Sequence, residues 1–127
     1  MLKTVHTENA PAAVGPYSQG MIAGDYMYVS GQLPMDPKTK KIVEGGIEAQ
    51  TRQCLNNAMA ILKEAGVDAN HVIKTTVFLK DMETFAAMNQ VYAEFFTDHK
   101  PARAAVEVAR LPLDVAVEIQ MFVYVGK

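Results

Sequence analysis

The chain has 127 residues, a length that suits one compact domain with a real hydrophobic core and is too short for two domains of ordinary size. Half of the residues are apolar and a fifth are charged, which is typical of a globular protein and argues against disorder. The formal net charge is −2 and the basic residues are dispersed, so we expect no nucleic-acid partner and no polybasic membrane anchor. Composition leaves small neutral or anionic metabolites as partners.

Cysteine usage and the N-terminal sequence indicate the compartment. Cys54 is the only cysteine, which excludes an intrachain disulfide, a CxxC redox pair and a multi-thiolate zinc site. The N-terminal stretch lacks the apolar core of a signal peptide, and no run approaches the ~20 apolar residues of a membrane span. We therefore expect a cytoplasmic protein that does not associate with a membrane.

The first third of the chain predicts strands and loops. Strands are expected at residues 2–6, 17–23 and 26–31, where β-rich apolar runs are bounded by polar, Gly-containing and Pro-containing stretches. Gly24-Asp25 suits a tight hairpin turn between the last two of these strands. Residues 32–46, with two prolines and a lysine cluster, are expected to form an exposed connection.

The middle of the chain predicts two amphipathic helices on either side of a strand. From Ile47 the apolar residues, Cys54 among them, recur at spacings of three and four as far as Gly66, a plausible C-terminal cap. Residues 71–80 are rich in β-branched and aromatic side chains and predict a strand. Asp81 can cap a second helix. The apolar stripe expected on that helix comprises Phe85, Met88, Tyr92, Phe95 and Phe96.

Two final strands, at residues 102–108 and 115–125, complete an α+β pattern with two helices on one face of a sheet. In the last strand, alternate residues from Val115 to Val123 should meet the helices, and those from Ala116 to Tyr124 should line the opposite face. That opposite face is too apolar for plain solvent, and the chain offers no third helix to cover it. We therefore expect other copies of the chain to cover it, which makes the protein a homo-oligomer.

Arg103 and Glu118 stand among the apolar residues of these last two strands. Burying a charge costs several kcal/mol of folding free energy unless the charge is paired, hydrogen-bonded or facing a polar cleft. An arginine offers a planar fork for a carboxylate, and a glutamate could orient or deprotonate a water molecule, which together suggest hydrolysis or hydration of a small carboxylic acid. A buried salt bridge between the two residues is the structural alternative, and strand parity does not decide whether they face one another.

Three further polar residues lie near element ends or on apolar faces. Asn89 follows Phe85 by one helical turn, where an amide either fastens a loop or lines a polar cavity. Tyr17 suits packing at a strand start, and Ser30 suits a turn before Gly31, although both could serve a site. The spacing of histidines and acidic residues predicts no metal site, and Walker, GxGxxG and GxSxG motifs are absent from the sequence.

Several blocks of sequence at compatible spacings resemble the RidA family, the reactive-intermediate deaminases that act on enamines and imines. The blocks cover nearly the whole chain and read APAAVGPYSQG, VSGQLPMDP, AGV, VFLKDM, MNQVYAEFF and PARAAVEVARLPLDVAVEIQ. The resemblance implies one domain over residues 1–127 with a chorismate-mutase-like α+β fold, a mixed β-sheet and two helices on one face. It also implies a homotrimer with a small-molecule cleft at each subunit interface, and no cofactor.

For the activity, the resemblance implies hydrolysis of 2-iminopropanoate, the tautomer of 2-aminoacrylate, and of 2-iminobutanoate to 2-oxo acids and ammonia. Arg103 would hold the substrate carboxylate, Glu118 would position water or shuttle protons, and Tyr17 would offer a hydroxyl near the imine. The residues implied to line the same cleft are Ser30, Gly31 and Asn89.

Ala105 departs from the family pattern, because many members carry cysteine at this position. A thiol role is impossible there, but the backbone N–H can still donate to a carboxylate beside Arg103. We therefore expect the departure to affect rate and substrate preference more than reaction type.

Two other functions remain open. A metabolite-binding regulatory module could use the same cleft without significant turnover, because a fold and its pocket can be reused. Ribonuclease or translation-inhibiting activity, attached to some relatives, is disfavoured by the acidic charge balance and the scattered histidines.

Overall fold

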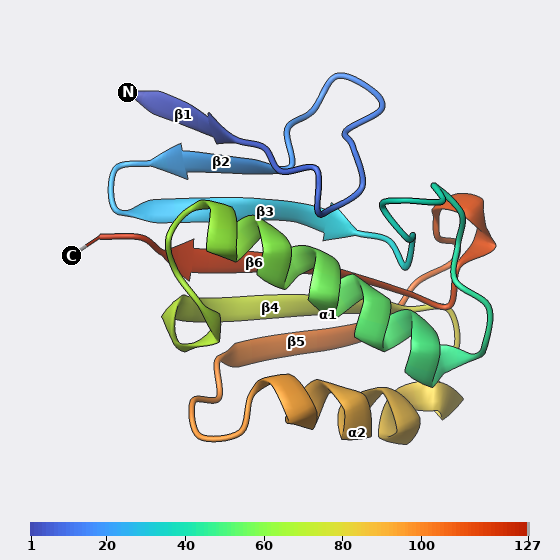
Figure 1. Cartoon of the computed structure of the whole chain (residues 1–127). Helices are drawn as coiled ribbons and strands as arrows, with labels where there is room; N and C mark the ends of the chain where they lie inside the picture. The colour runs from blue at the N-terminus through green and yellow to red at the C-terminus, as the bar shows by residue number, and fades with distance from the viewer. Residues whose placement is uncertain (127) are drawn as a thin grey trace.

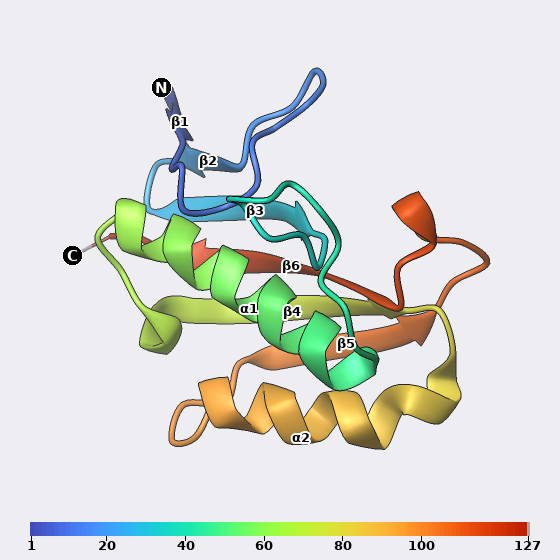
Figure 2. The same ribbon diagram turned by 45° about the vertical axis from the view of Figure 1, so that its right-hand side comes forward.

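Two helices lie on one face of a six-stranded sheet in the computed structural model, which describes residues 1–126 (Figures 1 and 2). The sheet order is β1-β2-β3-β6-β4-β5, and every neighbouring pair is antiparallel except β4 and β5, which are parallel. The expected α+β fold with a mixed sheet and two helices on one face is confirmed. The elements are β1 (Leu2–Val5), β2 (Gly20–Ala23), β3 (Tyr26–Gln32), α1 (Ile47–Glu64), β4 (Val72–Leu79), α2 (Phe85–Phe95), β5 (Ala102–Glu107) and β6 (Val117–Tyr124).

Both helices begin or end where the sequence predicts. At the end of α1, Gly66 has a φ of 81°, its N–H donates to the Lys63 carbonyl, and the Val67 N–H donates to the Leu62 carbonyl. These two bonds form a Schellman motif, which needs a residue that tolerates the left-handed conformation. Before α2, the Asp81 carboxylate accepts the Glu83 N–H at 3.0 Å and caps a short 3-10 turn that leads into the helix. Neither helix within residues 1–126 is long and apolar enough to span a membrane.

Residues 17–19 differ from the prediction, because they form a loop and β2 begins only at Gly20. The Gln19 carbonyl accepts the Ser30 N–H at 2.9 Å, and the Ser18 carbonyl accepts the Ser30 hydroxyl at 2.6 Å. The Gln19 side chain is buried. Its amide oxygen accepts the Thr7 backbone N–H, and its amide nitrogen donates to the Thr7, Ala10 and Pro11 carbonyls. One backbone bond and the Ser30 hydroxyl therefore hold this segment against the end of β3 in place of a longer strand ladder.

The alternation predicted for the last strand is confirmed. Val117, Ile119, Met121 and Val123 are at most 2% exposed and pack with the apolar face of α1, which includes Leu55. Two residues of the predicted range, Val115 and Ala116, precede β6, after a 3-10 turn at Pro112–Asp114.

The opposite face of the sheet carries no helix (Figures 1 and 2). Phe122 lies there between Tyr26 and Tyr28, with ring centroids 5.4 and 4.7 Å away, and Tyr124 packs edge-on against Tyr26. Tyr28 keeps 65% of its surface exposed. We call this aromatic surface of Tyr26, Tyr28, Phe122 and Tyr124 the open face; it lies outside the core that the helices cover.

Candidate functional site

Arg103 lies on β5, the edge strand of the sheet, and its side chain is exposed in the single chain. The sequence argument treated it as a buried charge, and this is wrong because the position of β5 at the edge leaves one side of the strand uncovered. By register Arg103 pairs with Thr75, whose hydroxyl bonds the Tyr92 hydroxyl of α2 at 2.7 Å. Neighbouring residues on paired strands share a face, so Arg103 projects on the helical side of the sheet.

Helix α2 holds the Arg103 guanidinium in place. The Arg103 Nη1 donates to Asn89 Oδ1 at 2.6 Å. The guanidinium carbon lies 4.7 Å from the Tyr92 ring centroid and 5.3 Å from that of Phe85, within the range of a cation–π interaction. No carboxylate in residues 1–126 lies within ion-pair distance of Arg103. Because a guanidinium has five N–H donors and one bonds Asn89, the others are available for an anion.

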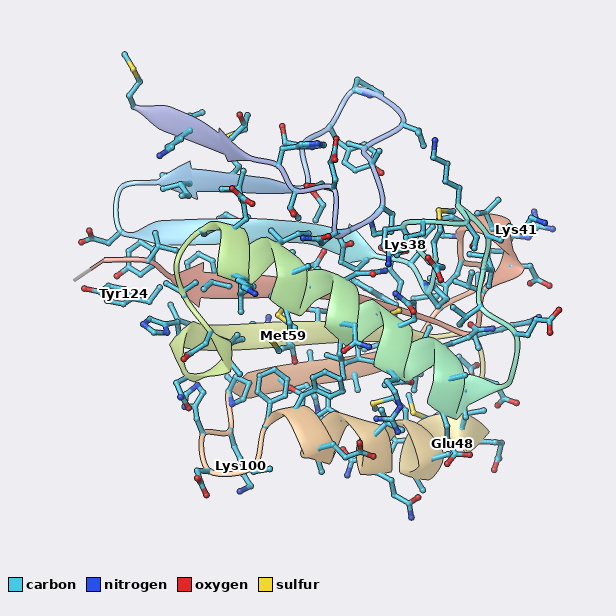
Figure 3. The ribbon with its side chains drawn as sticks, in the orientation of Figure 1. Lys38, Lys41, Glu48, Met59, Lys100 and Tyr124 are labelled. Atoms are coloured by element: carbon cyan, nitrogen blue, oxygen red, sulfur yellow. The ribbon has the colours of Figure 1, made fainter. Side chains whose placement is uncertain are left out.

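A hollow of about 410 Å³ opens beside this guanidinium, at the start of β5. Its lining includes Asn89, Tyr92, Phe96, Lys100, Pro101 and Arg103. Lys100 lies at the turn between α2 and β5 (Figure 3), where its ammonium donates to the Thr97 carbonyl at 2.7 Å. The hollow therefore carries two positive charges and suits an anionic ligand.

The backbone of β5 adds donors at the same edge. The Val108 N–H donates to the Leu79 carbonyl of β4 at 3.0 Å. Because backbone groups alternate in direction along a strand, the N–H groups of Arg103 and Ala105 point away from β4, toward the open edge. Ala105 therefore presents a backbone donor beside Arg103, as the sequence predicts for an alanine in place of cysteine.

Glu118 lies on β6 and faces the side of the sheet that carries no helix. It is half-buried, and its register partner is Phe78 of β4. Between Val29 and Gln32 the pairing of β3 with β6 shifts, which indicates a β-bulge at Ser30 and Gly31. A Cβ at Gly31 would lie 2.8 Å from the Glu118 carboxyl carbon and closer still to Oε2, so any larger residue there would force this carboxylate to move.

Burial raises the pKa of the Glu118 carboxyl above its ordinary value. No positively charged side chain in residues 1–126 forms an ion pair with it. A glutamate whose pKa is shifted toward neutrality, without a fixed partner, suits proton transfer to and from water.

Tyr17 and Gly31 line a second hollow, of about 260 Å³. Glu118 does not line it, but its carboxyl group lies against Gly31. Tyr17 is 54% exposed, and its side chain packs beside Gly15. The Ser30 hydroxyl donates to the Ser18 carbonyl, so its observed contact supports the turn. The chain thus gathers the predicted site residues into two groups: Arg103, Asn89 and Ala105 at the β5 edge, and Glu118, Gly31 and Tyr17 at the end of β3.

The two groups do not meet within one chain. Arg103 aligns with Thr75 and Met121 across the sheet, whereas Glu118 aligns with Phe78. The two residues are therefore two strands apart across the sheet and three residues apart along it, about 14 Å between Cα atoms, and they project from opposite faces. A salt bridge between Arg103 and Glu118 is thus excluded within the chain.

Sequence reasoning named Asn89 as a site residue but missed the support that Phe85 and Tyr92 give to Arg103, because it treated both rings only as part of the apolar stripe of α2. The three residues follow one another at spacings of four and three, which places them on one face of the helix. Cys54 is fully buried with its thiol 3.6 Å from the Val117 carbonyl, and burial raises the pKa of this thiol well above its ordinary value. It is a core residue, as predicted. Within residues 1–126, no three His, Cys, Asp or Glu side chains gather as a metal site requires.

The family profile described as endoribonuclease L-PSP matches residues 7–125. A RutC family protein of Pyrococcus horikoshii is 56% identical over 124 residues, which cover 98% of each chain. A 2-iminobutanoate/2-iminopropanoate deaminase of Salmonella typhimurium is 52% identical over 123 residues, covering 94% of this chain and 95% of the relative. A crystal structure of the Escherichia coli protein TdcF with bound serine superposes with a TM-score of 0.91 at 42% identity, covering 96% of this chain and 98% of that chain. The chain therefore belongs to the endoribonuclease L-PSP family, the RidA family that its motifs resemble.

Proposed function

We propose that the protein is a hydrolytic deaminase that converts 2-iminopropanoate and 2-iminobutanoate to 2-oxo acids and ammonia. The observation that carries this proposal is the guanidinium of Arg103, which is held by Asn89 and two aromatic rings yet has no carboxylate partner among residues 1–126. A relative 52% identical to this chain carries the name of this activity. A fixed, unpaired guanidinium binds the one group that all 2-imino acids share, their carboxylate.

The carboxylate would take two contacts at the β5 edge, one from the Arg103 guanidinium and one from the Ala105 N–H. These contacts leave the imine carbon exposed to a water molecule on the other side of the cleft. The carbon is already electrophilic, so orientation and a positioned water supply most of what hydrolysis needs.

Glu118 would manage the protons of this reaction. Starting from the protonated imine, the Glu118 carboxylate accepts a proton from the water that adds to the imine carbon, and the adduct carries a hydroxyl and an amino group on one carbon. The carboxylic acid then returns this proton to the amino group, which leaves as ammonia. As the carbonyl of the 2-oxo acid forms, the Glu118 carboxylate accepts the hydroxyl proton and passes it to solvent. Burial raises the pKa of Glu118, which makes it a stronger base than an ordinary carboxylate and suits a group that both takes up and releases a proton.

The complete site would lie between copies of the chain, in the homotrimer that the family resemblance implies. The separation of Arg103 and Glu118 on opposite faces supports this, because a second copy must bring the other half to each cleft. The exposed rings of the open face support it as well, because contact between copies would remove them from water. We propose the cytoplasm as the compartment, where reducing conditions suit a chain with a single thiol.

The test is the rate of pyruvate release when a serine dehydratase supplies 2-aminoacrylate. The wild-type protein should raise this rate above the spontaneous rate, and Arg103→Ala and Glu118→Ala should each remove most of the increase. Arg52→Ala and Glu48→Ala are matched controls, because each removes an exposed charge of the same type from α1. Equal pyruvate release with and without protein would refute the proposal, and ligand binding without turnover would favour a regulatory module.

A further inference from the structure

A strained turn lies between β5 and β6. Leu113 has a φ of 57° and Asp114 a φ of 54°, so two consecutive non-glycine residues adopt the left-handed conformation. A leucine is disfavoured there, whereas glycine or asparagine would adopt the same backbone at lower conformational cost. Such strain persists only where the surroundings fix the backbone, and it is concentrated at functional sites.

Three contacts fix this turn. The Lys80 ammonium lies 3.0 Å from the Asp114 carboxylate. The Lys80 N–H donates to the Ala116 carbonyl at 3.0 Å, and the Ala116 N–H donates to the Gln50 side-chain oxygen at 2.7 Å. The turn is therefore anchored to β4 and to α1, and the Leu113 side chain takes no part in the anchoring.

The turn instead presents Leu113 to the hollow that Tyr17 and Gly31 line. Leu113 is 67% exposed in the single chain. It lines this hollow of about 260 Å³ together with the apolar parts of Val14, Tyr17, Leu33, Met35 and Pro112. Two glutamines also line the hollow, but the amide of Gln19 bonds the residue 7–11 loop and the amide of Gln32 donates to the Ser30 carbonyl.

The hollow meets the proposed reaction centre at Gly31, which both lines it and faces the Glu118 carboxyl group. A substrate whose imine carbon lies beside Glu118 would therefore direct its remaining carbon atoms into this space. At roughly 30 Å³ for a water-sized group, the volume is ample for a side chain of four carbon atoms. The bonded amides leave few polar groups free to solvate a charged side chain.

Resting on the proposed deaminase function, we propose that this hollow receives the side chain of the imino acid and that Leu113 is a specificity-determining residue that forms its outer wall. The favoured substrate class then extends to 2-imino acids with branched or unbranched apolar side chains, and imino acids with charged side chains are disfavoured.

The test compares kcat/KM for imines generated in situ by amino-acid oxidases from 2-aminobutyrate, leucine and glutamate. Leu113→Gly and Leu113→Asn keep a residue that accepts the left-handed backbone, so both should fold. Each should lower the ratio of leucine-derived to aminobutyrate-derived activity about tenfold, because the apolar wall is lost. Leu2→Asn is the control: Leu2 is 68% exposed but lies on β1, the opposite edge strand from β5, and the ratio should not change.

The outcomes separate the two proposals. A wild-type protein inactive on all three imines would refute the deaminase function itself. Activity with an unchanged ratio in both Leu113 variants would overturn the role of Leu113 alone. Dissociation of both variants into monomers would also overturn it, because Leu113 would then be a contact between copies.

Discussion

Oligomers assembled from a mixture of Arg103→Ala and Glu118→Ala chains should recover activity that neither variant has alone. The reason is that one chain presents these residues on opposite faces, about 14 Å apart between Cα atoms. If each cleft takes Arg103 from one chain and Glu118 from its neighbour, some clefts in a mixed oligomer contain neither substitution.

The size of the recovery follows from counting clefts. A cleft works only when the Glu118→Ala chain supplies its Arg103 half and the Arg103→Ala chain supplies its Glu118 half. In a random equimolar mixture each condition holds half of the time, so about a quarter of all clefts should be intact before purification, and this fraction should follow the product of the two mole fractions. In purified trimers that contain both variants, about one cleft in three should be intact.

The assay needs oligomers that contain both variants. The two chains would carry different affinity tags, be mixed while unfolded and be refolded together, and the oligomers that retain both tags would be purified in sequence. Pyruvate release from 2-aminoacrylate then gives the fraction of active clefts. Arg103→Ala chains with both tags, refolded in the same way, are the control and should stay inactive.

Doubly tagged oligomers that are no more active than either variant alone would refute the reasoning. Such a result would mean that both groups act within one chain, or that one of them is not part of the site. Activity well above about a third of the wild-type value in doubly tagged trimers would also contradict the reasoning, because a closed trimer of the two variants contains at most one intact cleft.

Three other substitutions test single contacts of the site. Gly31→Ala should lower kcat about tenfold, because the new Cβ would displace the Glu118 carboxyl group 2.8 Å away, whereas Gly46→Ala, with open space at its Cβ, should not. Asn89→Asp should raise KM about tenfold or more and Asn89→Ala less, because a carboxylate 2.6 Å from Arg103 would compete with the substrate while an alanine only frees the guanidinium. Glu118→Gln should raise the melting temperature at neutral pH but not at about pH 3, where Glu118 is protonated in both folded and unfolded states. The sign follows from the raised pKa: ionisation costs more in the folded protein, so wild-type stability falls as pH rises from the ordinary carboxyl pKa through the raised value. A wild-type melting temperature that rises over this interval relative to Glu118→Gln would contradict the assignment.

The helices and the faces of β6 could be predicted because they depend on local patterns. The spacing of apolar residues from Ile47 defined α1, and the tolerance of glycine for positive φ located its end at Gly66. Parity alone assigned Ile119 to the helical face and Phe122 to the opposite face. Each of these inferences needed only neighbours within a few residues.

The order of the strands could not be predicted from local patterns, and this order determines the environment of Arg103. The pattern of residues 102–108 is that of a strand in which Arg103 stands among apolar residues, which suggested burial. Because β5 is at the edge of the sheet, the charge is exposed and available to a ligand. The strained backbone of Leu113 was also invisible, since nothing in the sequence PLD requires positive φ at a leucine.

The position of Arg103 relative to Glu118 depends both on the local residue pattern and on the order of the strands. Parity fixes the face of each residue within its own strand, but only the register through β4 shows that the two faces are opposite. The sequence left open whether the two residues form a salt bridge or a ligand site. The register excludes the salt bridge within a chain. Within residues 1–126, neither group has a partner of opposite charge. Under the proposed function, an imino acid bound between two copies would supply a carboxylate to Arg103 and a basic nitrogen near Glu118.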